Sequence, residues 1–260
     1  MKNKLNNELA VCGFAAVKAL EKEHPESIRR FYYTQDRALS FGGLCKQLAA
    51  KKVPYNMVPS QKDLEKLCGS IHHQGVVAMI DEKEVPPLTP ADVTEWVSKN
   101  ESALLLDRVG NANNLGAIIR SAAFFGIKHI IIPLDEAQSS ITTSSYRVAQ
   151  GGMEYVNVYS VSSIPRLLKD LEGKMVRIGT DVSAKKTVSE IKDLCIKNGK
   201  KKPALIVLGN EEHGISMQVK DLCDYLVTIP FAQNADSAAG LIESLNVAQA
   251  AAIILYECRQ

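Results

Sequence analysis

Short apolar runs alternate with helix-like stretches along the last 160 residues or so, and this alternation constrains the fold more than any other feature. Five runs have the length of a buried strand: 103–107, 129–132, 175–180, 204–208 and 225–229. Helical spacing of apolar residues separates them, at 115–125, 164–171 and 188–196. Apolar strands joined by helices indicate an α/β fold with a mostly parallel sheet that is covered on both faces.

The first 80 residues predict a smaller α/β module. We expect helices at 10–20, 44–51 and 64–68, and strands at 28–34 and 75–80. Three prolines and four charged residues then crowd into 81–90, which predicts a semi-rigid linker followed by a short helix around Trp96. The expected organisation is a small domain at 1–80, a linker at 81–100 and a large domain at 101–260.

Composition excludes several classes of protein. The hydrophobic share of 46% and the charged share of 23% are those of a globular chain, and no apolar run approaches the ~20 residues of a membrane helix. The six cysteines form no C-x-x-C pair, which disfavours a metal site and fits reduced thiols in the cytoplasm. The net charge of +2 divides into +5 for 1–80, −4 for 81–101 and +1 for the remainder. The small domain is therefore the basic part of the chain.

Ligands bind to parallel sheets beyond the carboxyl ends of the strands, so the loops after 103–107, 204–208 and 225–229 are the candidate sites. The first loop contains Asn111, Asn113 and Asn114, more asparagines than one helix cap needs, and we expect Asn114 to begin the helix. Arg120 lies ~9 Å along that helix and its side chain leans back toward the helix start. Its apolar neighbours allow it to face inward.

The second and third loops add a glycine, carboxylates and amides. Gly209 follows its strand directly and lets a ligand approach the backbone, and Glu211 can accept hydrogen bonds. Ser244 is expected to begin the last helix, with Asn246 in its first turn. Residues 247–255 are apolar on nearly every side, which predicts a buried helix.

Three common nucleotide and hydrolase signatures are absent from the sequence. There is no G-x-G-x-x-G after a strand, no G-x-x-x-x-G-K-[ST] and no G-x-S-x-G. Dinucleotide binding, nucleoside triphosphate binding and that type of hydrolase therefore lose support. The residues alone indicate an α/β ligand-binding protein and leave its reaction open.

The three loops together resemble the motifs of the SpoU/TrmH family of RNA ribose methyltransferases, in the SPOUT superfamily. The matching segments run from Asn114 to Ala122, from Leu208 to Ser216 and from Ser244 to Val247. In the first domain, 11–17 and 73–78 are similar to the two ends of the substrate-binding domain that many members carry. The resemblance covers nearly the whole chain.

The resemblance implies S-adenosylmethionine-dependent methyl transfer to a ribose 2′-oxygen of rRNA or tRNA. It also implies a C-terminal trefoil knot and a homodimer whose active site uses both subunits. Carried over by motif, the residues that line the cofactor pocket would be Gly209, Ile229, Pro230 and Leu245. Those of the catalytic neighbourhood would be Asn114, Arg120, Glu211, Ser244 and Asn246.

RNA is the expected partner, rRNA more than tRNA, and basic residues of the first domain are the candidate contacts: Arg29, Arg30, Lys51 and Lys52. Lys200–Lys202 is a second candidate patch. Two departures from the family pattern, the additional residues 231–239 and Ala149, favour an alternative. In that alternative the chain is an RNA-binding relative that has lost methyl transfer. Methylation of a base or another acceptor is a third interpretation.

Overall fold

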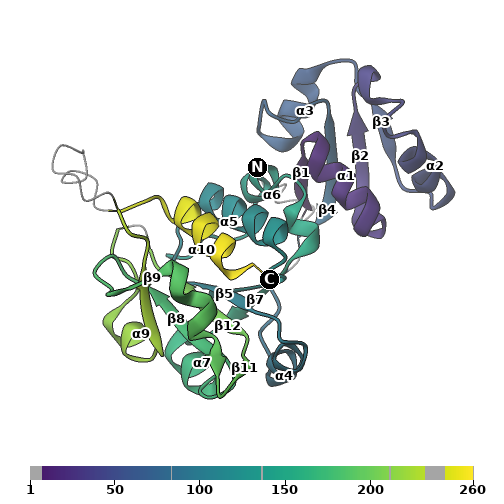
Figure 1. Ribbon diagram of the computed structural model, residues 1–260. Coiled ribbons are helices and arrows are strands. Elements are labelled where there is room, and N and C mark those ends of the chain that lie inside the picture. Colours follow the sequence, from purple (N-terminus) through teal and green to yellow (C-terminus); the bar gives the residue numbers. More distant parts are fainter. Residues whose placement is uncertain (1–7, 83, 136, 211, 232–243, 260) are drawn as a thin grey trace, which may run out of the picture. The chain divides into compact units, whose positions relative to one another are not determined.

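A computed structural model describes residues 8–82, 84–135, 137–210, 212–231 and 244–259 (Figure 1). The chain groups into two compact units, one made of 1–84 with 140–155 and the other of 85–139 with 156–260. Residues 140–155 thus group with the first unit, although they belong to the predicted large domain. The domain boundaries at 80 and 100 stay predictions.

The first unit contains a four-stranded sheet in the order β1-β4-β2-β3. Its strands are β1 (Glu8–Cys12), β2 (Ile28–Tyr33), β3 (Tyr55–Met57) and β4 (Val76–Asp81). All pairs are antiparallel except β2 with β3. Its α-helices are α1 (Phe14–Glu23), α2 (Gly42–Ala50), α3 (Gln61–Cys68) and α6 (Thr143–Ala149).

The predicted helix at 10–20 is wrong over its first three residues, which belong to β1. Val11 and Cys12 pair with Ala78 and Val77 of β4, and all five residues of β1 are buried. Pairing with a distant strand decides the conformation here, because a fully buried run carries no periodicity that separates strand from helix. Gly13, with φ of 101°, then turns the chain into α1.

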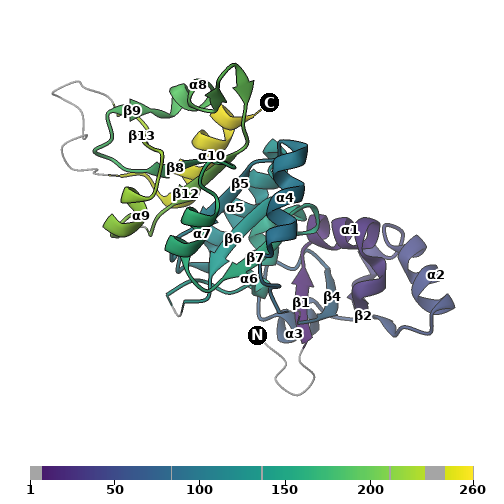
Figure 2. The same ribbon diagram turned by 90° about the horizontal axis from the view of Figure 1, so that it is seen from below.

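The second unit contains a seven-stranded sheet, parallel throughout, in the order β7-β6-β5-β12-β8-β13-β9 (Figure 2). Its strands are β5 (Ala103–Leu106), β6 (His129–Pro133), β7 (Asn157–Val161), β8 (Val176–Thr180), β9 (Lys186–Thr187), β12 (Ala204–Leu208) and β13 (Tyr225–Thr228). The predicted α/β fold class is confirmed. The knot stays a prediction.

Helices cover both faces of this sheet (Figure 1). One face carries α4 (Pro90–Lys99), α7 (Ile164–Asp170) and α9 (Met217–Asp221). The buried core on that side packs Trp96 and Leu168 against Leu105 and Leu205. The other face carries α5 (Ala112–Phe125) and α10 (Val247–Cys258), which pack on each other.

Two predicted helices differ from the structure. The stretch 188–196 divides into a 3-10 turn (Val188–Glu190), the short helix α8 (Ile191–Leu194) and the strand β10 (Ile196–Lys197), which pairs with β11 (Lys200–Lys201). Helix α10 is not buried all round, since Ile253 and Tyr256 are exposed. Its apolar residues outnumber the positions that its neighbours can cover, so one apolar stripe faces outward.

The proline-rich segment is attached to the second unit by backbone hydrogen bonds. Leu88 N–H donates to the carbonyl of Ser160 (2.9 Å), and Ser160 N–H donates to that of Pro86 (2.8 Å). Thr89 and Asp92 then cap α4 reciprocally. From Val85 onward the expected linker is therefore held against strand β7.

The described part of the chain bears on three features that the sequence argues against: a membrane-spanning helix, a metal site and disulfide bonds. No helix there has both the length and the apolar character needed to span a bilayer. No group of three or more His, Cys, Asp and Glu residues is arranged to hold a metal ion among those residues. All six cysteines are free thiols.

Candidate functional site

The loops after β8, β12 and β13 surround one cavity of about 450 Å³, together with the start of α10. We call it the carboxyl-edge cavity, because it lies where these parallel strands end. Four predicted cofactor residues line it, together with one predicted catalytic residue: Gly209, Ile229, Pro230, Leu245 and Ser244. Three segments far apart in the sequence therefore meet at this place.

A hydrogen bond joins the first and third loops. The amide of Asn246 donates to the amide oxygen of Asn114 over 3.1 Å, across 132 positions in the sequence. Both helix starts differ from the prediction. Asn111 caps α5, accepting from Asn113 N–H (2.8 Å), and Asn246 rather than Ser244 caps α10, accepting from Ala248 N–H (2.9 Å). Asn114 is therefore not the cap of α5, and its side chain accepts the hydrogen bond from Asn246.

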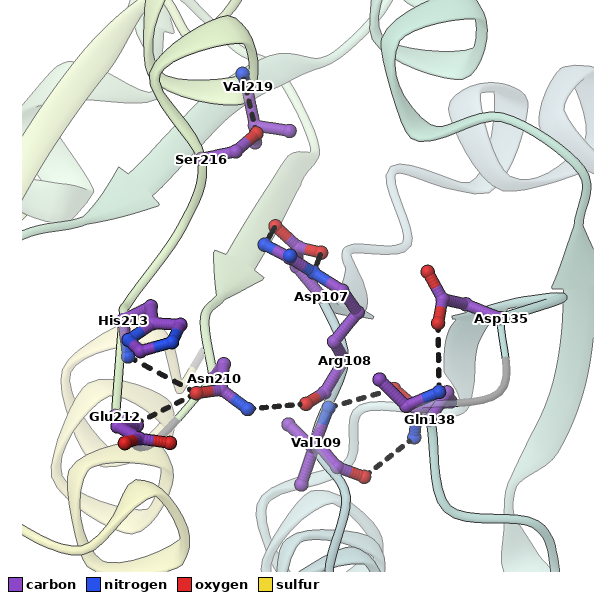
Figure 3. A network of polar contacts seen from close by, with 11 residues as sticks. Asp107, Arg108, Val109, Asp135, Gln138, Asn210, Glu212, His213, Ser216 and Val219 are labelled. Carbon is purple, nitrogen blue, oxygen red and sulfur yellow. Dashed lines mark hydrogen bonds and ion pairs between the residues drawn. The ribbon is translucent and has the colours of Figure 1, made fainter.

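Asn210 joins the loops after β5 and β12 (Figure 3). Its amide nitrogen donates to the carbonyl of Arg108 (3.0 Å), and its amide oxygen accepts from the backbone N–H of Glu212 and His213 (2.8 and 3.1 Å). Gln138 in turn brackets Val109, accepting from its N–H (2.9 Å) and donating to its carbonyl (3.1 Å). The sequence offered no role for Asn210, which fixes the shape of both loops.

Gly209 packs against the backbone of its own loop. A Cβ at this position would lie 2.2 Å from the carbonyl carbon of Gly214 and 2.3 Å from the nitrogen of Ile215. The predicted reason for this glycine was the approach of a ligand. The structure supplies a second reason, which is that the loop folds back on itself and leaves no space for a side chain.

Asp181 and Lys220 form an ion pair in the wall of the carboxyl-edge cavity, and the sequence-based prediction missed both residues. The Asp181 side chain is only 7% exposed, and it also accepts from the N–H and hydroxyl of Ser183 (2.7 and 2.6 Å). Burial alone would raise the pKa of Asp181, but hydrogen bonds from Lys220 and Ser183 outweigh burial and lower it to about 2. The signal in the sequence was the position of Asp181, directly after a predicted strand.

The depressed pKa of Asp181 makes stability depend on pH. The ionised carboxylate of Asp181 contributes fully to the free energy of unfolding above the pKa of the unfolded chain, about 3.9. This contribution is lost as the pH falls through the pKa of the folded protein, about 2. We expect Asp181→Asn to lower the free energy of unfolding by about 2 kcal/mol near neutral pH, and the difference from wild type to shrink in acid. Urea unfolding of both proteins over a pH series measures this. A difference that is the same at every pH would contradict it.

The carboxyl-edge cavity suits S-adenosylmethionine, the cofactor that the resemblance implies. Its volume lies within the range of ~300–1,000 Å³ that is usual for small-ligand sites. Apolar side chains such as Leu208, Ile215 and Val227 can hold an aromatic base.

Other predicted site residues lie apart from this cavity or outside the described ranges. Arg120 is exposed on α5 rather than turned inward, and it does not line the cavity. Glu211 lies outside the described residues, as do 232–239 of the predicted insertion. The sequence-based role of each stays a prediction.

The predicted RNA contacts of the first unit differ in their surroundings. Arg29 forms an ion pair with Asp81 (2.7 Å), and Arg30 forms one with Glu8. Lys51 and Lys52 are exposed directly after α2. Among these four residues, the two lysines are therefore the more available for a phosphate.

Two family profiles match the chain. The profile of the SpoU rRNA Methylase family matches 101–256, which contain the carboxyl-edge cavity. The profile described as RNA 2'-O ribose methyltransferase substrate binding matches 10–86, most of the first unit. These matches confirm the resemblance inferred from the three motifs.

Characterised relatives match over most of their length. The chain is 30% identical to the 23S rRNA (guanosine-2'-O-)-methyltransferase RlmB of Nitrosomonas europaea, over 95% of this chain and 89% of that protein. It is 37% identical to the protein of the same name from Acinetobacter baylyi, over 77% of each. Among solved structures, the SpoU methyltransferase AviRb of Streptomyces viridochromogenes, in complex with the cofactor AdoMet, is 25% identical. It has a TM-score of 0.71 and covers 98% of this chain and 90% of that one.

Proposed function

The chain belongs to the SpoU rRNA methylase family, and we propose that it transfers the methyl group of S-adenosylmethionine to a ribose 2′-hydroxyl of RNA. The observation that carries this proposal is that the second and third motifs line one cavity, while the first motif is joined to the third by the hydrogen bond between Asn246 and Asn114. The two RlmB relatives are 23S rRNA methyltransferases, so ribosomal RNA is the favoured substrate over tRNA.

The bound cofactor would supply a methyl group on a sulfonium, whose sulfur leaves as a neutral thioether when the methyl group is transferred. The protein then has to place the ribose oxygen in line with the methyl carbon and ease the loss of the hydroxyl proton. Asn114 and Asn246 form a hydrogen-bonded amide pair beside the cavity, suited to orienting a sugar hydroxyl. Asp181 remains ionised at neutral pH, and its ion pair with Lys220 holds together the wall of the carboxyl-edge cavity.

Arg120 is exposed and does not line the carboxyl-edge cavity of its own subunit, so a homodimer that brings it to a ribose bound at the second copy is part of the proposal. On α5, Arg120 shares its exposed side with Phe124, four residues later, which is 82% exposed. Ile253 and Tyr256 expose apolar surface on α10, which packs on α5. Burial of this stripe by a second copy would place Arg120 at the interface, where its guanidinium can hold a phosphate and stabilise the forming alkoxide.

The first unit is proposed to hold the RNA before transfer. Its net charge of +5 over 1–80 and its exposed Lys51 and Lys52 support electrostatic contact with phosphates. A cytoplasmic location completes the proposal. It is supported by six free thiols, which fit a reducing compartment.

Transfer of tritium from labelled S-adenosylmethionine into RNA tests the function. Total RNA from a strain that lacks the protein is the substrate, and nuclease digestion with mass spectrometry locates the methyl group. We expect incorporation into the large ribosomal RNA at a ribose. Label on a base, or S-adenosylmethionine binding without any transfer, would overturn the proposal in favour of one of the two alternatives.

In the same assay, Asn246→Asp tests the amide pair separately from the helix cap. Aspartate caps a helix as well as asparagine does, but its carboxylate cannot donate to Asn114. We expect the melting temperature to stay near that of wild type and the transfer rate to fall about tenfold, the value of one hydrogen bond. Asn246→Ala should lower both, since it also removes the cap. Equal transfer by Asn246→Asp and wild type would contradict a role for the amide pair.

A further inference from the structure

A second cavity, of about 680 Å³, lies at the other edge of the large sheet. We call it the amino-edge cavity, since Ala204, the first residue of β12, and Ser102, just before β5, line it. Residues at or beside the C-terminal ends of α4, α5, α8 and α10 complete the lining, among them Lys99, Phe125, Cys195 and Cys258. None of the three motifs contributes a residue to it, and it shares Phe124 and Tyr256 with the surface proposed to meet a second copy.

The amino-edge cavity concentrates positive charge. It is lined by six cationic side chains, Lys99, Lys128, Lys192, Lys201, Lys202 and Arg259, and by one carboxylate, Glu101. The lining therefore carries +5, whereas the whole chain carries +2, so that the rest of the chain sums to −3. A concave surface of one sign focuses its field and attracts ions of the opposite sign.

Neighbouring groups neutralise only part of this charge. Lys99 pairs with Glu95 and Lys128 with Glu101 (2.5 and 2.8 Å). The other four cations form no ion pair with a carboxylate among the described residues. Four helix ends contribute about half a negative charge each. With these and Glu95 included, the cavity keeps a net charge of roughly +2.

The fold holds several of these cations in place. Lys201 belongs to the β10–β11 hairpin, opposite Ile196. The ammonium of Lys202 donates to the carbonyl of Gly173 (2.6 Å), and the guanidinium of Arg259 lies 3.3 Å from the centre of the Tyr256 ring. Cations that are already ordered lose less conformational entropy when they bind a ligand than free side chains do.

We propose that the amino-edge cavity binds the phosphodiester backbone of the RNA substrate, away from the ribose that receives the methyl group. Spread over several elements, the cations suit a chain of phosphates better than a single anion. Contacts of this kind position a nucleic acid without reading its sequence. The inference rests on the proposed function, which supplies RNA as the partner.

Charge reversal at the cavity tests this inference. Lys192→Glu and Lys201→Glu are made singly and together, and binding to purified 23S rRNA is measured without cofactor over a series of KCl concentrations. We expect each single variant to make the slope of log K against log salt shallower by about 1, and the double variant to bind at least about tenfold more weakly. S-adenosylmethionine affinity, measured by calorimetry, should not change, because neither residue lines the carboxyl-edge cavity.

Lys185→Glu is the matched control. Lys185 is exposed in the same unit and lines neither cavity, and its reversal changes the net charge equally. Equal losses for Lys185→Glu and Lys201→Glu, or salt slopes that match wild type, would overturn the inference. RNA binding without methyl transfer by the wild-type protein would overturn the proposed function and leave this inference standing. A wild-type protein that binds no RNA would overturn both.

Discussion

Replacement of Arg120 by lysine should lower the rate of methyl transfer by about a hundredfold and leave the melting temperature unchanged. Arg120 is exposed and outside the carboxyl-edge cavity, so the substitution should alter stability by less than about 0.5 kcal/mol and cofactor affinity not at all. The rate falls because lysine keeps the charge but loses the planar fork that binds two oxygens of a phosphate together. A preorganised donor of this kind is worth about 10²–10³ in rate.

Single-turnover transfer from labelled S-adenosylmethionine to rRNA measures the effect of Arg120→Lys, with calorimetry for cofactor binding. Arg166→Lys is the control, since Arg166 is 84% exposed on α7 in the same unit. It should behave as wild type. If Arg120→Lys retained most of the turnover, the geometry of the guanidinium would not be what the reaction requires.

Gly209→Ala should weaken cofactor binding by about a hundredfold while the chain still folds. The new Cβ would lie 2.2 Å from the backbone of Gly214, so the loop must retreat by more than about 1 Å. Besides Gly209, five residues of this loop line the carboxyl-edge cavity: Asn210, Glu212, His213, Gly214 and Ile215. A displacement of that size can weaken the function of a site by about a hundredfold. Overpacking also lowers the free energy of unfolding by about 1–3 kcal/mol.

Calorimetry with S-adenosylmethionine and a thermal melt together measure the effect of Gly209→Ala. Gly42→Ala is the control, because a Cβ on Gly42 would meet no heavy atom within 4 Å at the first position of α2. That variant should bind the cofactor as wild type does and melt at the same temperature or slightly higher. Unaltered cofactor affinity in Gly209→Ala would show that the loop tolerates the shift.

The second unit was the more predictable part of the chain, for a physical reason. Strands of a parallel sheet that is covered on both faces are apolar throughout, and the runs at 103–107 and 204–208 stand out in the sequence as β5 and β12. The edge strands β3, β7 and β9 escaped prediction, because β9 has only two residues, all three residues of β3 are exposed and only Ser160 of β7 is buried. None of them is a continuous buried apolar run. Strand β1 was misread because its apolar run continues into α1 without a polar break.

For the site, the sequence by itself determined which residues could do the chemistry, because motifs at strand ends record side-chain types and local spacing. It identified Gly209, Ile229 and Leu245 as the lining of a pocket, and the structure brings them to one cavity. Only the tertiary structure decided which asparagine caps which helix, that Asn246 bonds to Asn114 and that Asp181 meets Lys220. Such pairs join segments that are distant along the chain, and a sequence pattern records neighbours in the chain but not neighbours in space.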